Sequence, residues 1–93
     1  MADYSSYRLD GYAWVDAYIA QMGQEAFHAY RSKVERALEA LSEGRYYAVD
    51  DVREEDRELF VKLCCHYITG HPEYYFSDDY SRIYREKVYY AKE

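Results

Sequence analysis

The sequence predicts an all-α protein, a small four-helix bundle built as a single domain over residues 1–93. Apolar side chains recur every three or four residues in four segments. Three of the four glycines, Gly23, Gly44 and Gly70, directly follow such segments, and the only proline, Pro72, comes shortly after the last of them. No segment of useful length alternates apolar and polar residues, so no sheet is expected.

The first two expected helices span about residues 10–22 and 24–43. The apolar face of the first comprises Tyr12, Val15, Ile19 and Met22. The apolar face of the second comprises Phe27, Tyr30, Val34, Ala37, Leu38 and Leu41. In the second helix Glu35, Arg36 and Glu39 lie on the opposite face, which makes it the clearest amphipathic helix of the chain.

The third expected helix, about residues 52–69, differs because apolar residues cover about two thirds of its circumference. They are Leu59, Phe60, Val61, Leu63, Cys64, Cys65, Tyr67 and Ile68. A helix that is apolar over so much of its surface must be covered by other elements, so we expect this one at the centre of the bundle.

The fourth expected helix, about residues 78–92, has the weakest pattern. Its apolar side consists of Tyr80, Ile83, Tyr84, Val88 and Ala91. Elsewhere the best candidate for a strand is the segment 45–49, which is too short to be stable without a partner strand.

Tyrosine occupies 14 of the 93 positions, and the pattern Tyr-Tyr-x-x-Asp-Asp occurs at residues 46–51 and again at 74–79. We call this pattern the tyrosine–aspartate element. One interpretation is structural, because aspartates just before a helix accept hydrogen bonds from its free amides while the tyrosines fill gaps. The other is functional, because tyrosine gives a large contact area at low entropic cost and is enriched in binding surfaces.

The charge distribution favours the functional interpretation. The net charge is −6, and residues 43–79 hold ten acidic and four basic residues, whereas the rest of the chain holds eight of each. Capping needs only one or two carboxylates per helix, so the excess indicates steering toward a basic surface. The candidate partner-binding residues are Tyr46, Tyr47, Asp50, Asp51, Glu54, Glu55, Tyr74, Tyr75, Asp78 and Asp79.

The expected spacing of the two copies suggests an elongated footprint. A helix of about 17 residues between them would separate them by about 25 Å. Glu54, Glu55 and Glu58 would lie in the interval. About 25 Å also corresponds to some seven base steps of duplex DNA, so such carboxylates would be positioned to imitate phosphates.

Patterns that could carry chemistry are weak. Glu25 and His28 have the Glu-x-x-His spacing of di-metal bundles, but those sites need two copies and this chain has one. Four potential zinc ligands lie close in sequence, at Cys64, Cys65, His66 and His71. They lack the usual ligand spacing, and no phosphate loop or nucleophile elbow occurs. We expect no metal, no cofactor and no enzyme.

The composition also bears on location. No apolar run is long enough to cross a bilayer, and the N-terminus has no secretory signal. The adjacent residues Cys64 and Cys65 diverge on a helix, so reduced thiols in a cytoplasmic protein are expected. The negative charge disfavours direct binding to nucleic acid or to an anionic membrane.

Residues 58–75 read Glu-Leu-Phe-Val-Lys-Leu-Cys-Cys-His-Tyr-Ile-Thr-Gly-His-Pro-Glu-Tyr-Tyr. This stretch resembles part of the colicin-type nuclease immunity proteins, which are small acidic four-helix antidotes with a helix ending in His-Pro and a tyrosine pair soon afterwards. The likeness covers less than a fifth of the chain. Here the tyrosines follow Pro72 more closely, and less chain remains after them. The resemblance therefore illustrates a mechanism of action and does not assign the chain to that family.

The function expected from the sequence is stoichiometric protein binding. The protein would be an inhibitor or antidote, of anti-defence or immunity type, that occludes a basic, nucleic-acid-handling surface of a larger protein. Tyrosines would supply contact area, and carboxylates would supply orientation and association rate. The alternative is an assembly subunit that self-associates through tyrosines, with Tyr89 and Tyr90 as further contact candidates. A metal-dependent enzyme is the third and weakest hypothesis.

Overall fold

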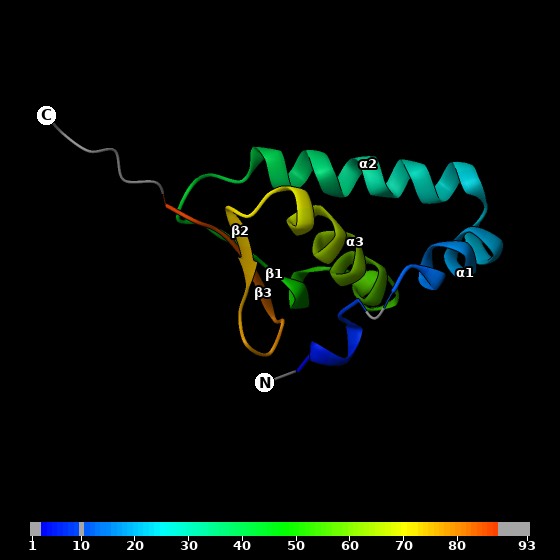
Figure 1. Cartoon of the computed structure of the whole chain (residues 1–93), viewed down its shortest axis with the longest axis horizontal. Coiled ribbons are helices and arrows are strands. Elements are labelled where there is room, and N and C mark those ends of the chain that lie inside the picture. The colour runs from blue at the N-terminus through cyan, green and yellow to red at the C-terminus, as the bar shows by residue number, and fades with distance from the viewer. Residues whose placement is uncertain (1–2, 10, 88–93) are drawn as a thin grey trace, which may run out of the picture.

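The computed structural model of the protein describes residues 3–9 and 11–87 (Figure 1). Its helices are α1 (Ala13–Met22), α2 (Gln24–Ala40) and α3 (Arg57–Gly70). Its strands are β1 (Tyr46–Ala48), β2 (Tyr74–Phe76) and β3 (Arg82–Arg85). Single 3₁₀ turns are η1 (Ser5–Tyr7), η2 (Val49–Asp51) and η3 (Glu54–Asp56). The prediction of an all-α four-helix bundle is therefore wrong, because three helices pack with a three-stranded antiparallel sheet.

The first two helices form where the apolar periodicity predicts them. They meet at Gly23, whose φ of 91° is readily adopted by glycine and rarely by other residues. α2 buries Phe27, Val34 and Leu38 on one face. It ends at Ala40, earlier than expected, because the chain turns there to enter the sheet.

α3 is the most buried helix, as its broad apolar surface predicts. Its buried residues are Leu59, Phe60, Val61, Lys62, Leu63, Cys64 and Tyr67. It packs against α2 and against all three 3₁₀ turns. It begins at Arg57 and not near residue 52, because η2 and η3 occupy the preceding residues. Arg57 reaches back to this region, and its guanidinium donates to the carbonyl oxygens of Val52 and Asp50 at 2.9 and 3.0 Å.

The sheet has the order β1-β3-β2, with β3 antiparallel to both neighbours. β1 and β2 therefore run in the same direction. Tyr84 pairs with Tyr46 on one side and with Tyr75 on the other, while Ile83 pairs with Tyr47 and Phe76. Ile83 is fully buried, so its side of the sheet faces the core and Tyr84 lies on the opposite side.

A fourth helix is expected at 78–92, but its described part, residues 78–87, contains a hairpin turn and β3. Over such a short stretch, Ile83 and Tyr84 fit a helical stripe and a strand equally well. Pairing with β1 and β2 decides in favour of the strand, and the pairing with the distant β1 leaves no local pattern in the sequence. Of the residues assigned to the helical stripe, Val88 and Ala91 lie outside the described residues. The segment 45–49, too short to be stable without a partner strand, contains β1 because β3 provides that partner.

Candidate functional site

Each copy of the tyrosine–aspartate element places one tyrosine against the helices. The hydroxyl of Tyr47 donates to the carbonyl oxygen of Ala37 at 2.8 Å, and that of Tyr74 donates to Leu38 at 2.6 Å. Both acceptors lie in the last turn of α2, where carbonyl groups lack the usual i+4 partner, although that of Leu38 also accepts from the N–H of Leu41 at 3.1 Å. The guanidinium of Arg85 donates to two further carbonyl oxygens at this end of α2, those of Glu39 and Leu41, at 3.2 and 2.7 Å. These two tyrosines therefore anchor the sheet to the C-terminus of α2.

The other tyrosine of each copy points to the opposite side of the sheet. There Tyr46, Tyr84 and Tyr75 form a row across the three strands, which we call the tyrosine face. The ring of Tyr84 lies 5.3 Å from each neighbour and is stacked on that of Tyr75. Tyr46 and Tyr75 are 45% and 50% exposed. The guanidinium of Arg82 lies 4.8 Å from the centre of the Tyr46 ring, close enough for a cation–π contact.

The aspartates of both copies meet at one end of the sheet, because β1 and β2 run in the same direction. We call Asp50, Asp51, Asp78 and Asp79 the aspartate end. Tyr4 joins the two pairs: its N–H donates to the carbonyl oxygen of Asp79 at 2.7 Å, and its hydroxyl donates to the carboxylate of Asp50. The two copies thus belong to one compact region and do not bracket α3 as an elongated footprint.

In the second copy, Asp79 is a structural residue. Its carboxylate accepts hydrogen bonds from the hydroxyl and N–H of Ser81, at 2.6 and 3.0 Å, and from the hydroxyl of Ser77 at 2.9 Å. These donors lower the pKa of Asp79 to about 2, with the Ser81 hydroxyl as the largest cause. They close the hairpin turn between β2 and β3. The expectation that this segment caps a fourth helix is therefore wrong.

In the first copy, Asp50 is the engaged carboxylate. The hydrogen bond to Asp50 is the main reason why the pKa of the Tyr4 phenol is raised. Neither Asp50 nor Asp51 caps α3, which begins only at Arg57. Asp51 and Asp78 are exposed, and neither carboxylate forms a hydrogen bond or an ion pair among residues 3–9 and 11–87. Each copy therefore leaves one carboxylate open to solvent.

The two predicted glutamates lie on η3, away from the strands. Glu55 forms an ion pair with Arg53, and its own backbone amide and this guanidinium lower the pKa of Glu55. Glu54 is exposed. η3 packs against α3, so these residues extend the acidic region toward that helix and do not belong to the tyrosine face.

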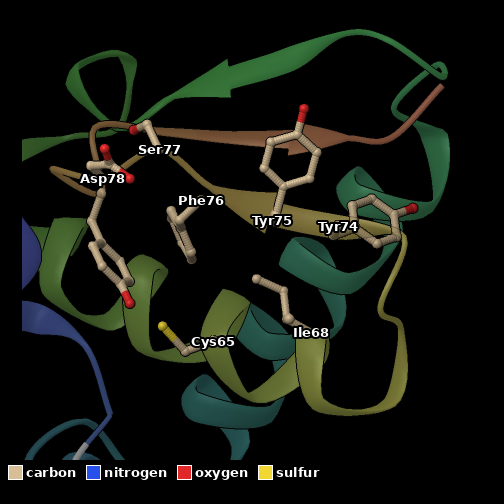
Figure 2. Close-up of a pocket in the computed structure, with 8 residues that line it drawn as sticks. Cys65, Ile68, Tyr74, Tyr75, Phe76, Ser77 and Asp78 are labelled. Atoms are coloured by element: carbon tan, nitrogen blue, oxygen red, sulfur yellow. The ribbon is translucent and has the colours of Figure 1, made fainter.

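A hollow of about 410 Å³ lies between β2 and α3, and we call it the β2 cleft (Figure 2). It is lined by Cys65, Ile68, Tyr74, Tyr75, Phe76, Ser77, Asp78 and Tyr80. In Figure 2 the side chain of Phe76 points from β2 toward α3, where Cys65 and Ile68 lie, whereas Tyr75 points to the other side. Two of the predicted residues that face solvent, Tyr75 and Asp78, border this cleft.

One wall of the cleft depends on an unusual backbone conformation. Tyr80 has φ 58°, which is rare for a bulky side chain. Its N–H donates to the carbonyl oxygen of Ser77 at 2.9 Å, and its ring stacks on Phe76 at 4.8 Å. The hairpin turn thus holds an aromatic ring beside the exposed edge of β2.

Sequence reasoning missed Tyr84 and Arg82 in the tyrosine face, Tyr4 at the aspartate end and Tyr80 in the cleft. The only local signal for the first two was the short stretch Arg-Ile-Tyr-Arg, residues 82–85, in which a β-branched residue lies next to an aromatic one. That signal is too short to separate a strand from a helix.

The patterns discounted for chemistry stay apart in the structure. Glu25 and His28 are exposed on α2, and the described residues contain no group of three or more side chains arranged to hold a metal ion. Burial raises the pKa of the thiols of Cys64, in the core, and Cys65, in the cleft. The ring of His71 stacks on that of Tyr67 at 3.9 Å. No described helix has the length and apolar character required to span a bilayer.

Comparisons with protein-family models, with curated proteins and with solved structures found no match. The described residues also form three helices and a sheet in place of the four-helix architecture implied by the resemblance to immunity proteins. Any functional conclusion must therefore come from the surfaces of the protein.

Proposed function

We propose that the protein acts by stoichiometric binding to another protein through its tyrosine face. The observation that carries this proposal is the row of Tyr46, Tyr84 and Tyr75, in which two segments distant in sequence present exposed rings on one side of a sheet. Tyrosine is enriched at the energetic centres of interfaces. Rings already held by contact with one another on paired strands lose little entropy when a partner covers them.

The proposed partner is a basic, nucleic-acid-handling protein whose surface is occluded, so that this protein is an inhibitor or antidote. The net charge of −6, with the whole excess in residues 43–79, supports a basic partner. The exposed carboxylates of Asp51 and Asp78 lie at the aspartate end. Asp78 follows Tyr75 by three residues, which span at most about 10 Å of chain, so one interface can cover ring and carboxylate together.

Affinity capture with tagged protein tests this proposal. The double variant Tyr46→Ala/Tyr75→Ala removes the two exposed rings, and Tyr12→Ala is the matched control because Tyr12 is 67% exposed next to α1. We expect the double variant to bind its partner at least tenfold more weakly, since each anchor contributes about 1–3 kcal/mol. The control should bind like the parent protein, and raising the salt concentration should weaken both.

The captured partner then serves for the functional test. We expect its binding to nucleic acid to disappear at one equivalent of this protein. Equal capture by the double variant and the parent would refute the role of the tyrosine face. Capture that is insensitive to salt would contradict the basic partner, and a partner that still binds nucleic acid in the complex would contradict occlusion.

Self-association is a second candidate, and it is favoured by the position of β1 and β2, which are the two outer strands of the sheet formed by the described residues. Two copies paired along these edges would extend the tyrosine face into one larger surface. The repulsion between two copies of charge −6 opposes such pairing. The further contact candidates Tyr89 and Tyr90 lie outside the described residues. Light scattering decides, because a monomer favours the inhibitor and a stable dimer favours assembly.

A further inference from the structure

We infer that the β2 cleft receives an extended, basic segment of the partner, which adds to the sheet as a fourth strand antiparallel to β2. The inference rests on the proposed function, since it specifies a second way in which the same partner is held. It assigns a role to the cleft, which the tyrosine face does not explain.

The backbone of β2 offers bonding groups on the side away from β3. The N–H of Ser77 donates to the carbonyl oxygen of Arg82, and the N–H of Glu86 donates to that of Glu73. Since bonding groups alternate along an antiparallel strand, the backbone N–H and carbonyl groups of Tyr74 and Phe76 point to the outer edge. The N–H of Tyr74 donates to the carbonyl oxygen of His71 at 3.2 Å.

The groups left at this edge are the carbonyl oxygen of Tyr74 and both the N–H and the carbonyl oxygen of Phe76. No residue in the described part of the chain forms a backbone hydrogen bond with them. An exposed strand edge of this kind is the site at which extended peptides add to sheets.

The cleft follows this edge. All five consecutive residues from 74 to 78 line it, although neighbouring residues in a strand point to opposite faces. A hollow bordered by both sets of side chains must run along the outer edge of the strand. Across from it, α3 contributes the apolar side chains Cys65 and Ile68. The core-facing side chain of an added strand would therefore be apolar.

The charges around the cleft specify the other side of the added strand. The exposed carboxylate of Asp78 borders the cleft at one end of β2, and Glu73 precedes the strand at the other end. Lysine or arginine residues on the outward side of the peptide would lie near these acids and near the exposed ring of Tyr75. A second copy of this chain fits less well, because edge-to-edge pairing would bring acidic residues of both copies together.

The test uses ¹⁵N-labelled protein and a blocked hexapeptide of alternating lysine and leucine. Residues directly opposite each other in an antiparallel pair share one face of the sheet, so the residue that bonds to Phe76 must be a leucine. We expect amide exchange of Phe76 to slow at least tenfold at saturating peptide. N-methylation of the leucine amides should weaken binding about tenfold or more, because the bonds to β2 are lost. N-methylation of the lysine amides, which point away, should leave binding unchanged and is the matched control.

Other outcomes overturn the inference. They are equal binding of the two methylated peptides, no change at Phe76 with millimolar peptide, protection at β1 in place of β2, and dimerisation through β2. The result is separable from the proposed function. Capture that depends on the exposed tyrosines without protection of Phe76 would refute only the inference, and protection of Phe76 with capture that ignores those tyrosines would refute only the tyrosine face.

Discussion

The two copies of the tyrosine–aspartate element have the same pattern of tyrosine and aspartate but opposite structures. In the first copy, residues 46–51, the first tyrosine is exposed and the second is bonded to α2. In the second copy, residues 74–79, the first tyrosine is bonded to α2 and the second is exposed. The aspartates are reversed as well, since the first of 46–51 and the second of 74–79 are the engaged carboxylates.

The reversal follows from the register of the sheet. β3 pairs Tyr84 with the first tyrosine of one copy and the second tyrosine of the other, so the copies are offset by one residue. A shift of one residue moves every side chain of a strand to the other face. A repeat in sequence is therefore not a repeat in structure here, and each copy divides its residues between holding the fold and facing solvent.

The largest effect that separates the copies concerns the two tyrosines of β2. Tyr74 is 3% exposed and its hydroxyl bonds to Leu38, so Tyr74→Ala should cost about 3–4 kcal/mol of unfolding free energy. Tyr75 is half exposed and loses mainly its stack on Tyr84, so Tyr75→Ala should cost less than about 1 kcal/mol. Urea unfolding of both variants at neutral pH measures the difference.

A milder variant at the same position is needed as well, because the free energy of unfolding of a small domain is only about 5–15 kcal/mol and the alanine variant removes a large part of it. Tyr74→Phe keeps the ring and removes the hydroxyl, and it should cost about 1–2 kcal/mol. Similar losses for the alanine variants at 74 and 75 would show that the two rings are equivalent, and the register described above would be wrong.

The helices could be predicted from sequence because their stabilising pattern is local. Apolar residues such as Phe27, Val34 and Leu38 recur within one segment, and Gly23 and Gly70 mark helix ends as expected. The strands could not, because β1 and β2 have three residues each and are stabilised by β3, which is distant in sequence from β1. Short apolar runs give no period, and the pairing partner decides the outcome.

The candidate site could be predicted only in part for the same reason. Composition drew attention to both tyrosine pairs, which are conspicuous in sequence. It could not say which ring of each pair faces solvent, because that depends on a register of one residue. It also could not find Tyr84, which lies at the centre of the tyrosine face only because β3 runs between the other strands.

A smaller effect compares the two tyrosines of β1. The hydroxyl of Tyr47 donates to the carbonyl oxygen of Ala37, which lacks a helical partner at the end of α2, so Tyr47→Phe should cost about 1 kcal/mol. Tyr46→Phe leaves the ring that contacts Tyr84 and should change stability by less than about 0.5 kcal/mol. Urea unfolding measures both variants. If Tyr46→Phe lost more unfolding free energy than Tyr47→Phe, the assignment of Tyr47 as the tyrosine bonded to α2 would be wrong.

The smallest effect concerns the aspartates of the second copy and appears only in acid. Hydrogen bonds from Ser81 and Ser77 lower the pKa of Asp79 from its ordinary value of 3.8 to about 2. The folded state therefore binds the proton less readily than the unfolded chain. The resulting stabilisation is complete above about pH 4 and is lost as the pH falls from 4 to 2.

Asp79→Asn removes this titration, so its unfolding free energy should fall less than that of the parent protein between pH 5 and pH 2. Asp78→Asn is the matched control, because the Asp78 carboxylate accepts no hydrogen bond from described residues, and it should keep the parent profile. Urea unfolding at pH 5, 4, 3 and 2 compares the three proteins. If Asp78→Asn flattened the profile and Asp79→Asn did not, the assignment of engaged and solvent-facing carboxylates in this copy would have to be exchanged.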